Sequence, residues 1–100
     1  MMRVIARRTL RLFWESPGRG DAERPLRAWF AEARRAAWRT PADVKKAHRN
    51  ASILGNDRVV FNIAGNKYRL IVALHYVAQI AFIRFVGTHA GYDRIDAEEI

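Results

Sequence analysis

The chain of 100 residues contains no cysteine, and this absence removes several kinds of chemistry at once. Disulfides, thiolate nucleophiles and cysteine-based zinc sites are all excluded. One hundred residues with a hydrophobic content of 50% are enough for one domain with one core and too few for two. We therefore expect residues 1–100 to form a single α+β domain that is stabilised by packing alone.

Long apolar runs are missing as well. No segment reaches the roughly 18 apolar residues that a transmembrane helix needs. The first twenty residues mix arginines with apolar side chains and contain no small-residue cleavage site, which argues against a secretory signal. These features predict a soluble, cytoplasmic protein.

Acidic residues are scarce in the first half of the chain. Residues 1–49 hold thirteen Lys and Arg against five Asp and Glu, whereas residues 50–100 hold five of each, so the net charge of +8 lies in the first half. The positive electrostatic field of such a region favours the binding of polyanions or of an acidic protein partner. Scattered charges, however, also form solvated helix surfaces. Arg outnumbers Lys by fifteen to three, and the planar guanidinium suits phosphate recognition.

Apolar spacing predicts helices in the first part of the chain. Residues 2–6 indicate a short strand, and Thr9 is the expected N-cap of a short helix over residues 10–15. Residues 16–25 have the composition of a turn followed by a helix start. The longest helix should then cover residues 26–37, where apolar side chains keep helical spacing.

A third helix is predicted by Thr40 as N-cap, Pro41 at the first helical position and Asp43 three residues after the cap. Residues 50–58 are expected to be a loop. Beyond them the apolar period changes and indicates an antiparallel meander of three strands, over residues 58–63, 67–76 and 79–87. With the N-terminal strand, this predicts two to three N-terminal helices on one face of a small, mainly antiparallel sheet, and a second face open to solvent.

Alternation sorts the side chains of the strand over residues 67–76 onto two faces. The expected core face consists of Tyr68, Leu70, Val72, Leu74 and Tyr76, and the opposite face of Lys67, Arg69, Ile71, Ala73 and His75. The last strand does not divide in this way, because neither of its two faces is plainly polar. Arg84 stands out there, since an arginine among apolar neighbours needs an open surface or a partner such as Asp93 or a helix end.

His89 and Tyr92 follow the last strand, where a rigid scaffold ends and side chains can project. The sequence contains no phosphate-binding glycine loop and no serine elbow, and its histidines lack the spacing of a metal site. The remaining possibility is metal-free acid–base chemistry on a bound phosphate. RNA can be cleaved in this way because its own 2′-hydroxyl is the nucleophile.

Two blocks of the sequence, "RVVFNIAGNKYRL" and "FVGTHAGYDRID", resemble the HigB-type toxins of bacterial type II toxin–antitoxin systems, in the RelE superfamily. The resemblance extends over nearly the whole chain. It implies an mRNA interferase that acts on the ribosome without a cofactor or metal. It also implies a helix-turn-helix antitoxin of the HigA type that represses its own operon, so that DNA is contacted only through the antitoxin. We expect an acidic segment of that antitoxin to contact the basic first half of this chain.

The candidate catalytic residues are Arg84, His89 and Tyr92. Arg84 would hold the scissile phosphate, and His89 and Tyr92 would transfer protons in either order. Within the resembling blocks, Lys67, Arg69 and Asp93 are candidates for RNA binding. The alternative is a non-catalytic toxin on the same scaffold that inhibits a protein such as gyrase, and such a binder would not require a convergent acid–base set.

Overall fold

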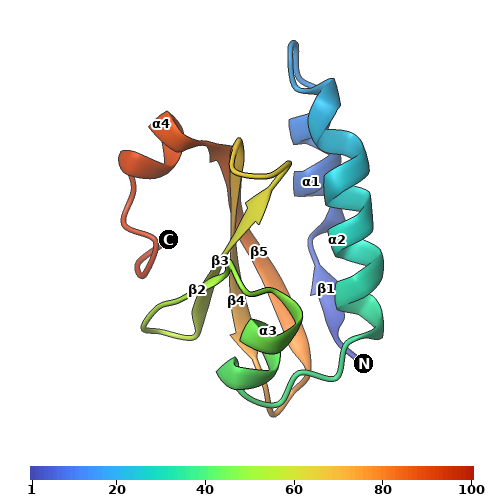
Figure 1. Ribbon diagram of the computed structural model, residues 1–100, viewed down its shortest axis with the longest axis vertical. Helices are drawn as coiled ribbons and strands as arrows, with labels where there is room; N and C mark the ends of the chain where they lie inside the picture. The colour runs from blue at the N-terminus through green and yellow to red at the C-terminus, as the bar shows by residue number, and fades with distance from the viewer.

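A five-stranded sheet forms the centre of the computed structural model, which describes residues 1–100 (Figure 1). The strands are β1 (Arg3–Ile5), β2 (Ser52–Ile53), β3 (Arg58–Ile63), β4 (Tyr68–His75) and β5 (Ile80–Thr88), and their order in the sheet is β1-β5-β4-β3-β2. The meander of β3, β4 and β5 is antiparallel, and β1 pairs in parallel with β5. The prediction of a mainly antiparallel sheet joined by the N-terminal strand is therefore confirmed.

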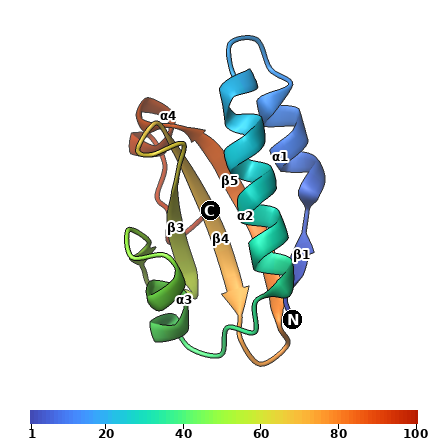
Figure 2. The same ribbon diagram turned by 45° about the vertical axis from the view of Figure 1, so that its right-hand side comes forward.

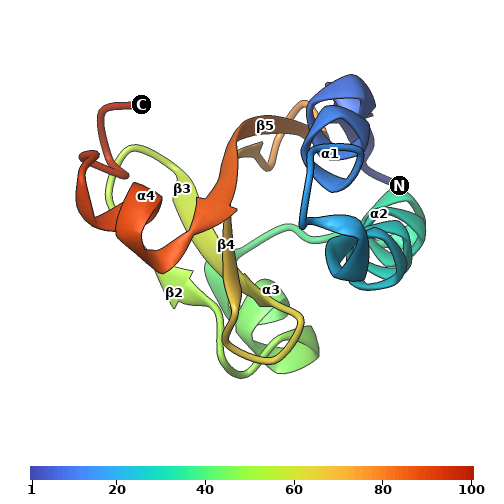
Figure 3. The same cartoon turned by 90° about the horizontal axis from the view of Figure 1, so that it is seen from above.

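The helices are α1 (Arg7–Trp14), α2 (Glu23–Arg35), α3 (Pro41–Ala47) and α4 (His89–Asp93), with a 3₁₀ turn, η1 (Gly20–Ala22), before α2. Figure 2 shows α1 and α2 side by side against the sheet, and Figure 3 shows α4 on its other side. We call the face covered by α1, α2 and α3 the first face, and the opposite one the second face. None of the helices combines the length and the apolar character that crossing a bilayer requires.

Local signals set most of the element boundaries, with three corrections. Helix α3 begins as predicted, because Thr40 and Asp43 each accept a hydrogen bond from the other's backbone N–H. Thr9 is not an N-cap: its N–H donates to the oxygen of Ala6, so the first turn of α1 is already closed there. Helix α2 starts at Glu23, before the predicted start at residue 26. The proline in its first turn does not prevent this, because backbone nitrogens in the first turn have no hydrogen-bond partner within the helix. The predicted loop contains β2, which pairs with β3 at the sheet edge.

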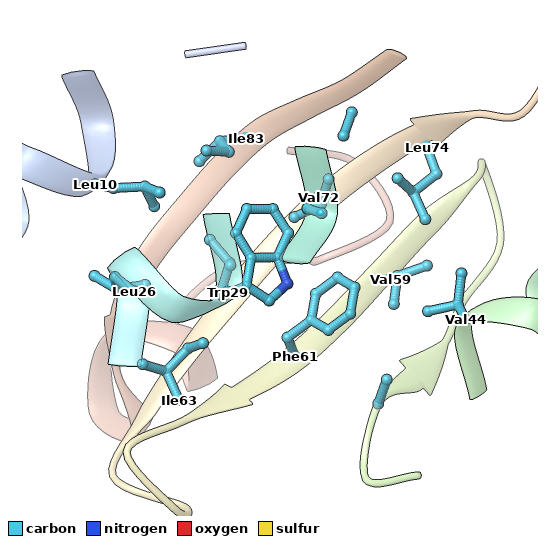
Figure 4. Packing of buried hydrophobic residues seen from close by; sticks show 14 of the residues in the cluster. Leu10, Leu26, Trp29, Val44, Val59, Phe61, Ile63, Val72, Leu74 and Ile83 are labelled. Atoms are coloured by element: carbon cyan, nitrogen blue, oxygen red, sulfur yellow. The ribbon is translucent and has the colours of Figure 1, made fainter. Parts of the chain in front are cut away.

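The main core lies between the first face and the helices (Figure 4). Phe61 of β3 is at its centre, with ring centroids 5.3 Å from Trp29, 6.1 Å from Trp38 and 5.0 Å from His48. The predicted core face of β4 is confirmed, since Tyr68, Leu70, Val72 and Leu74 are all fully buried in this core, while Tyr76 is half-buried beside it. The first face therefore provides the rigid platform on which the rest of the fold is built.

A β-bulge explains why β5 shows no clean alternation. Ile71 pairs with Phe85 and Val72 with Ile83, so Arg84 is an extra residue without a partner on β4. Such a residue shifts the phase of the strand: Ile83 and Val86 pack on the first face, whereas Phe85 packs on the second. Arg84 itself is exposed.

The second face is not open along its whole length, which corrects the sequence prediction. After α4 the chain turns back, and Ala97 is buried against Val60 and Ile71, with half-buried apolar neighbours around them: Leu54, Phe85, Tyr92, Ile95 and Ile100. We call residues 94–100 the final segment. It covers the apolar part of this face, because the bulge leaves Phe85 there and exposed apolar area is costly in water.

We expect Phe61→Ala to lower the free energy of unfolding by about 3–5 kcal/mol, the usual cost of removing a buried phenylalanine ring. The ring contacts aromatic side chains from α2, from the connection that follows it and from the end of α3, so little relaxation can fill the cavity. Urea denaturation would measure the change, with Val77→Ala as the control because Val77 is fully exposed. A loss below about 1 kcal/mol would show that Phe61 does not anchor the core.

Candidate functional site

His89 lies at the start of α4, beside the turn that joins β3 to β4. Thr88 fixes the beginning of this helix, because its hydroxyl oxygen accepts a hydrogen bond of 3.2 Å from the N–H of Gly91. The ring of His89 reaches across to the turn, where Nε2 donates to the main-chain oxygen of Asn66. Two segments 23 residues apart in the sequence are joined in this way.

That hydrogen bond defines the tautomer of His89. A carbonyl oxygen can only accept, so Nε2 must carry the proton. In the neutral ring Nδ1 is then the nitrogen with a free lone pair. His89 is half-buried, and Nδ1 is the ring nitrogen that remains able to accept a hydrogen bond.

Arg69 and Tyr92 lie next to one another on the second face. The guanidinium carbon of Arg69 is 5.8 Å from the centre of the Tyr92 ring, within the range of a cation–π contact. Nη1 of Arg69 also donates to the side-chain oxygens of Asn62 and Asn66, the latter at 2.7 Å. Asn66 therefore contacts both Arg69 and His89, and holds the two side chains on one surface.

We call Arg69, His89 and Tyr92 the polar cluster. It contains two of the three predicted catalytic residues and one predicted RNA-binding residue. Asn62 and Asn66, which position it, were missed by the sequence analysis. The only signal for them was the pair of polar amides flanking the turn between two apolar strands.

Arg84 is not part of the polar cluster. It lies at the bulge, five residues before His89, which along an extended strand is roughly 15 Å. Its Nε donates to the main-chain oxygen of Ile100 at 3.2 Å, and it contacts neither Asp93 nor a helix end, the partners considered from the sequence. Asp93 is exposed, and its carboxylate forms no hydrogen bond or ion pair within the chain. The structure thus separates the predicted phosphate holder from the predicted proton-transfer groups.

Lys67 also points away from the polar cluster. Strand β4 begins at Tyr68, so Lys67 belongs to the preceding turn and is not subject to strand alternation. Its ammonium pairs with Asp21 of η1, which also accepts a 2.6 Å hydrogen bond from the hydroxyl of Tyr68. The expected position of Lys67 beside Arg69 is therefore wrong, and the residue ties the β3–β4 turn to the helical layer.

Asp21 and Lys67 shift each other's titration. The hydrogen bond from Lys67, and after it the one from Tyr68, lower the pKa of Asp21 below its ordinary value of 3.8. The hydrogen bond to Asp21 raises the pKa of Lys67 above 10.5. Both residues are therefore charged at neutral pH, and their pairing helps to hold the turn that carries Asn66.

The three histidines occupy three separate places. His48 packs on Phe61 and has its Nε2 3.4 Å from a carboxylate oxygen of Glu32. His75 makes an edge-to-face contact with Phe82, with ring centroids 5.2 Å apart. Neither residue contacts the polar cluster, so His89 is the histidine of this surface.

The basic excess of the first half forms a surface on the helical layer. A groove of about 240 Å³ runs between α1 and α2, with Leu10, Trp14 and Phe30 among its lining residues. Three arginines on its rim lie over aromatic rings, Arg27 over Trp14 and both Arg7 and Arg34 over Phe30, at 4.9 to 5.6 Å from the ring centres. These stacked guanidiniums form a positively charged rim around an apolar floor.

Comparison with known families gives a match over most of the chain. Residues 22–95 match a family model described as the HigB toxin, the RelE-like toxic component of a toxin–antitoxin system. No curated protein matches the chain. The matched range contains the whole polar cluster and the strands that carry it.

We expect Asp21→Asn to lower the melting temperature at pH 7, because it removes the ion pair that ties the β3–β4 turn to η1. A carboxyl with a lowered folded-state pKa contributes stability above its unfolded pKa, near 3.8, and loses that contribution as the pH falls through the folded-state pKa. The melting curves of the two proteins should therefore converge in acid. Thermal scans from pH 7 to pH 2 would test this, with the unpaired Asp93→Asn as the control. A difference that persists unchanged in acid would contradict it.

Proposed function

This chain belongs to the HigB family of RelE-like toxins, the toxic components of toxin–antitoxin systems, and we propose that it is a ribosome-dependent endoribonuclease. In this proposal it cleaves translated mRNA in the cytoplasm. The observation that supports it is the convergence of Arg69, His89 and Tyr92 on one surface, held there by Asn66. A base, an acid and a cation are the groups that metal-free RNA cleavage needs.

We assign the base to His89 and the acid to Tyr92. Nδ1 of His89 takes the proton from the 2′-hydroxyl, whose oxygen attacks the adjacent phosphorus. The bond from phosphorus to the 5′-oxygen breaks, and the hydroxyl of Tyr92 protonates that oxygen as it leaves. The products are a 2′,3′-cyclic phosphate and a 5′-hydroxyl, so atoms and protons balance.

Arg69 supplies the positive charge in this mechanism. Its guanidinium is already fixed by two side-chain amide oxygens and by the Tyr92 ring, so it needs little reorganisation when charge builds up on the phosphate. Both His89 and Tyr92 are half-buried, and no lid encloses them. In this proposal the ribosome supplies the missing orientation by holding the mRNA in line with the two groups.

We expect His89→Ala and Tyr92→Phe each to reduce cleavage of ribosome-bound mRNA by about 10²–10⁴-fold, the usual contribution of a general acid or base. The fold should be unchanged, since both side chains lie outside the main core. The matched control is His75→Ala, which removes an exposed histidine from the other end of β4. Mapping of mRNA 5′ ends and melting temperatures on the same proteins would separate loss of chemistry from loss of fold.

The same experiment tests the alternative class of toxin. Full cleavage by both variants would remove the polar cluster from consideration as the active site. Intact transcripts with the unmodified protein, together with blocked DNA supercoiling, would instead identify a toxin that inhibits gyrase by binding.

We propose that the cognate antitoxin binds the arginine-rimmed groove between α1 and α2 through an acidic segment. The groove offers an apolar floor for one or two side chains and guanidiniums for carboxylates. It lies on the helical layer, whereas α4 is on the other side of the sheet (Figure 3). An antitoxin segment bound there would not touch the polar cluster.

We expect charge reversal at Arg34, Arg35 and Arg39 to slow association with the antitoxin and to weaken its dependence on salt, because complementary charge mainly speeds encounter. Arg34→Glu alone should show part of this effect. Arg94→Glu is the matched control, since it makes the same charge change on the exposed final segment. Stopped-flow association at several ionic strengths would measure it. Equal effects of Arg34→Glu and Arg94→Glu would show that only net charge matters and would rule out this groove.

A further inference from the structure

Two arginines from different strands converge on one oxygen atom of the second face. Arg58, the first residue of β3, donates from Nε and Nη2 to the main-chain oxygen of Ile100, at 3.1 and 2.6 Å. Arg84, at the bulge of β5, donates from Nε to the same oxygen at 3.2 Å. Neither arginine forms an ion pair with a carboxylate side chain.

The geometry of this pair matches the recognition of a phosphate oxygen. Three N–H groups from two guanidiniums converge on a single acceptor, and guanidinium donors are also suited to the several oxygens of a phosphate. The two Nη groups of Arg84 form no hydrogen bond within the chain, and the side chain is exposed. The pair can therefore bind a group with more oxygens than the one it now holds.

The oxygen of Ile100 is delivered by the final segment. Ala97 is buried on the second face, and the main-chain oxygen of Glu98 accepts a 3.0 Å hydrogen bond from the side chain of Asn56. The Glu98 carboxylate accepts a further hydrogen bond of 3.3 Å from the N–H of Gly55. Most residues of this segment are nevertheless exposed. Such a segment opens locally at a much lower cost than the core.

We propose that Arg58 and Arg84 form a phosphate-binding site for the RNA backbone, and that the final segment occupies this site in the free protein. The proposal rests on the proposed function, because the ligand is the RNA whose scissile phosphate lies at the polar cluster. The bulge sets Arg84 on the same face as that cluster and several residues along the strand, so the pair binds a phosphate further along the RNA than the scissile one. RNA binding then displaces the oxygen of Ile100.

The test measures binding of a single-stranded RNA in which every 2′-hydroxyl is methylated, so that it cannot be cleaved. For single strands the logarithm of the binding constant falls with the logarithm of salt by about 0.7 for each phosphate contact. We expect Arg84→Gln and Arg58→Gln each to flatten this slope by about 0.7. The double variant should flatten it no further, because both arginines hold one phosphate. Arg49→Gln removes the same charge from an exposed site after α3 and should not change the slope.

A second arm tests the role of the final segment. Ile100→Gly keeps the main-chain oxygen but removes an apolar side chain that packs on the second face. If the segment fills the site nine-tenths of the time, its release should tighten RNA binding about tenfold. In the Arg58→Gln, Arg84→Gln double variant the same change should have no effect on affinity.

Each unfavourable outcome identifies what fails. No salt-dependent binding of this RNA by the unmodified protein would overturn this site, whereas the proposed cleavage is tested separately by mapping the 5′ ends of ribosome-bound mRNA. Normal binding with an unchanged slope in Arg84→Gln would overturn this site alone, and cleavage by the polar cluster would stand. In that case reduced hydrogen-exchange protection of residues 96–100 in Arg84→Gln would assign the pair to fastening the final segment. Arg84 is exposed, so its variant should fold even if Arg58→Gln does not.

Discussion

The single extra residue in β5 determines how the two faces of the sheet are used. Without a bulge at Arg84, Phe85 would face the helices and Val86 the opposite side, because strand side chains alternate strictly. With it, Val86 stays in the main core while Phe85 joins Val60 and Ile71 on the second face. A small apolar patch is created there, and the final segment packs on it. Arg84 lies at this bulge, and His89 and Tyr92 lie in α4, directly after the end of the strand.

The sheet thus separates two kinds of interaction. The first face, with Phe61 at its centre, contains most of the buried apolar residues, and the outer side of the helices carries the arginine-rimmed groove. On the second face there is little core, and polar side chains are held by hydrogen bonds between the β3–β4 turn, β4 and α4. A protein partner bound to the helices and an RNA bound to the second face would therefore not compete for the same residues. The ion pair of Lys67 with Asp21 connects the two layers at the turn.

Much of the fold could be predicted from the sequence because its signals are local. Thr40, Pro41 and Asp43 define the start of α3 by side-chain chemistry within four residues, and the alternation of β4 identified its buried face. The strand over residues 58–63 was predicted at its observed bounds, and the matching family confirms the resemblance carried by "RVVFNIAGNKYRL" and "FVGTHAGYDRID". The errors concern Thr9, the start of α2, strand β2 and the covered part of the second face, where the outcome depends on neighbouring elements. An edge strand of two residues forms only because β3 is there to pair with it.

The sequence by itself determined the α+β class, the core face of β4, the basic first half and the residue types available for acid–base chemistry. Only the tertiary structure decided which of those residues meet. Asn66 bridges α4 and β4, and this contact brings together His89, Tyr92 and Arg69. Lys67 instead forms an ion pair with Asp21, and Arg84 donates to the same oxygen of Ile100 as Arg58. The physical reason is that a bulge and a turn are exceptions to periodicity. Periodicity fixes the direction of a side chain only while the strand is regular, and most of the candidate site residues lie in turns, at the bulge or beyond the end of a strand.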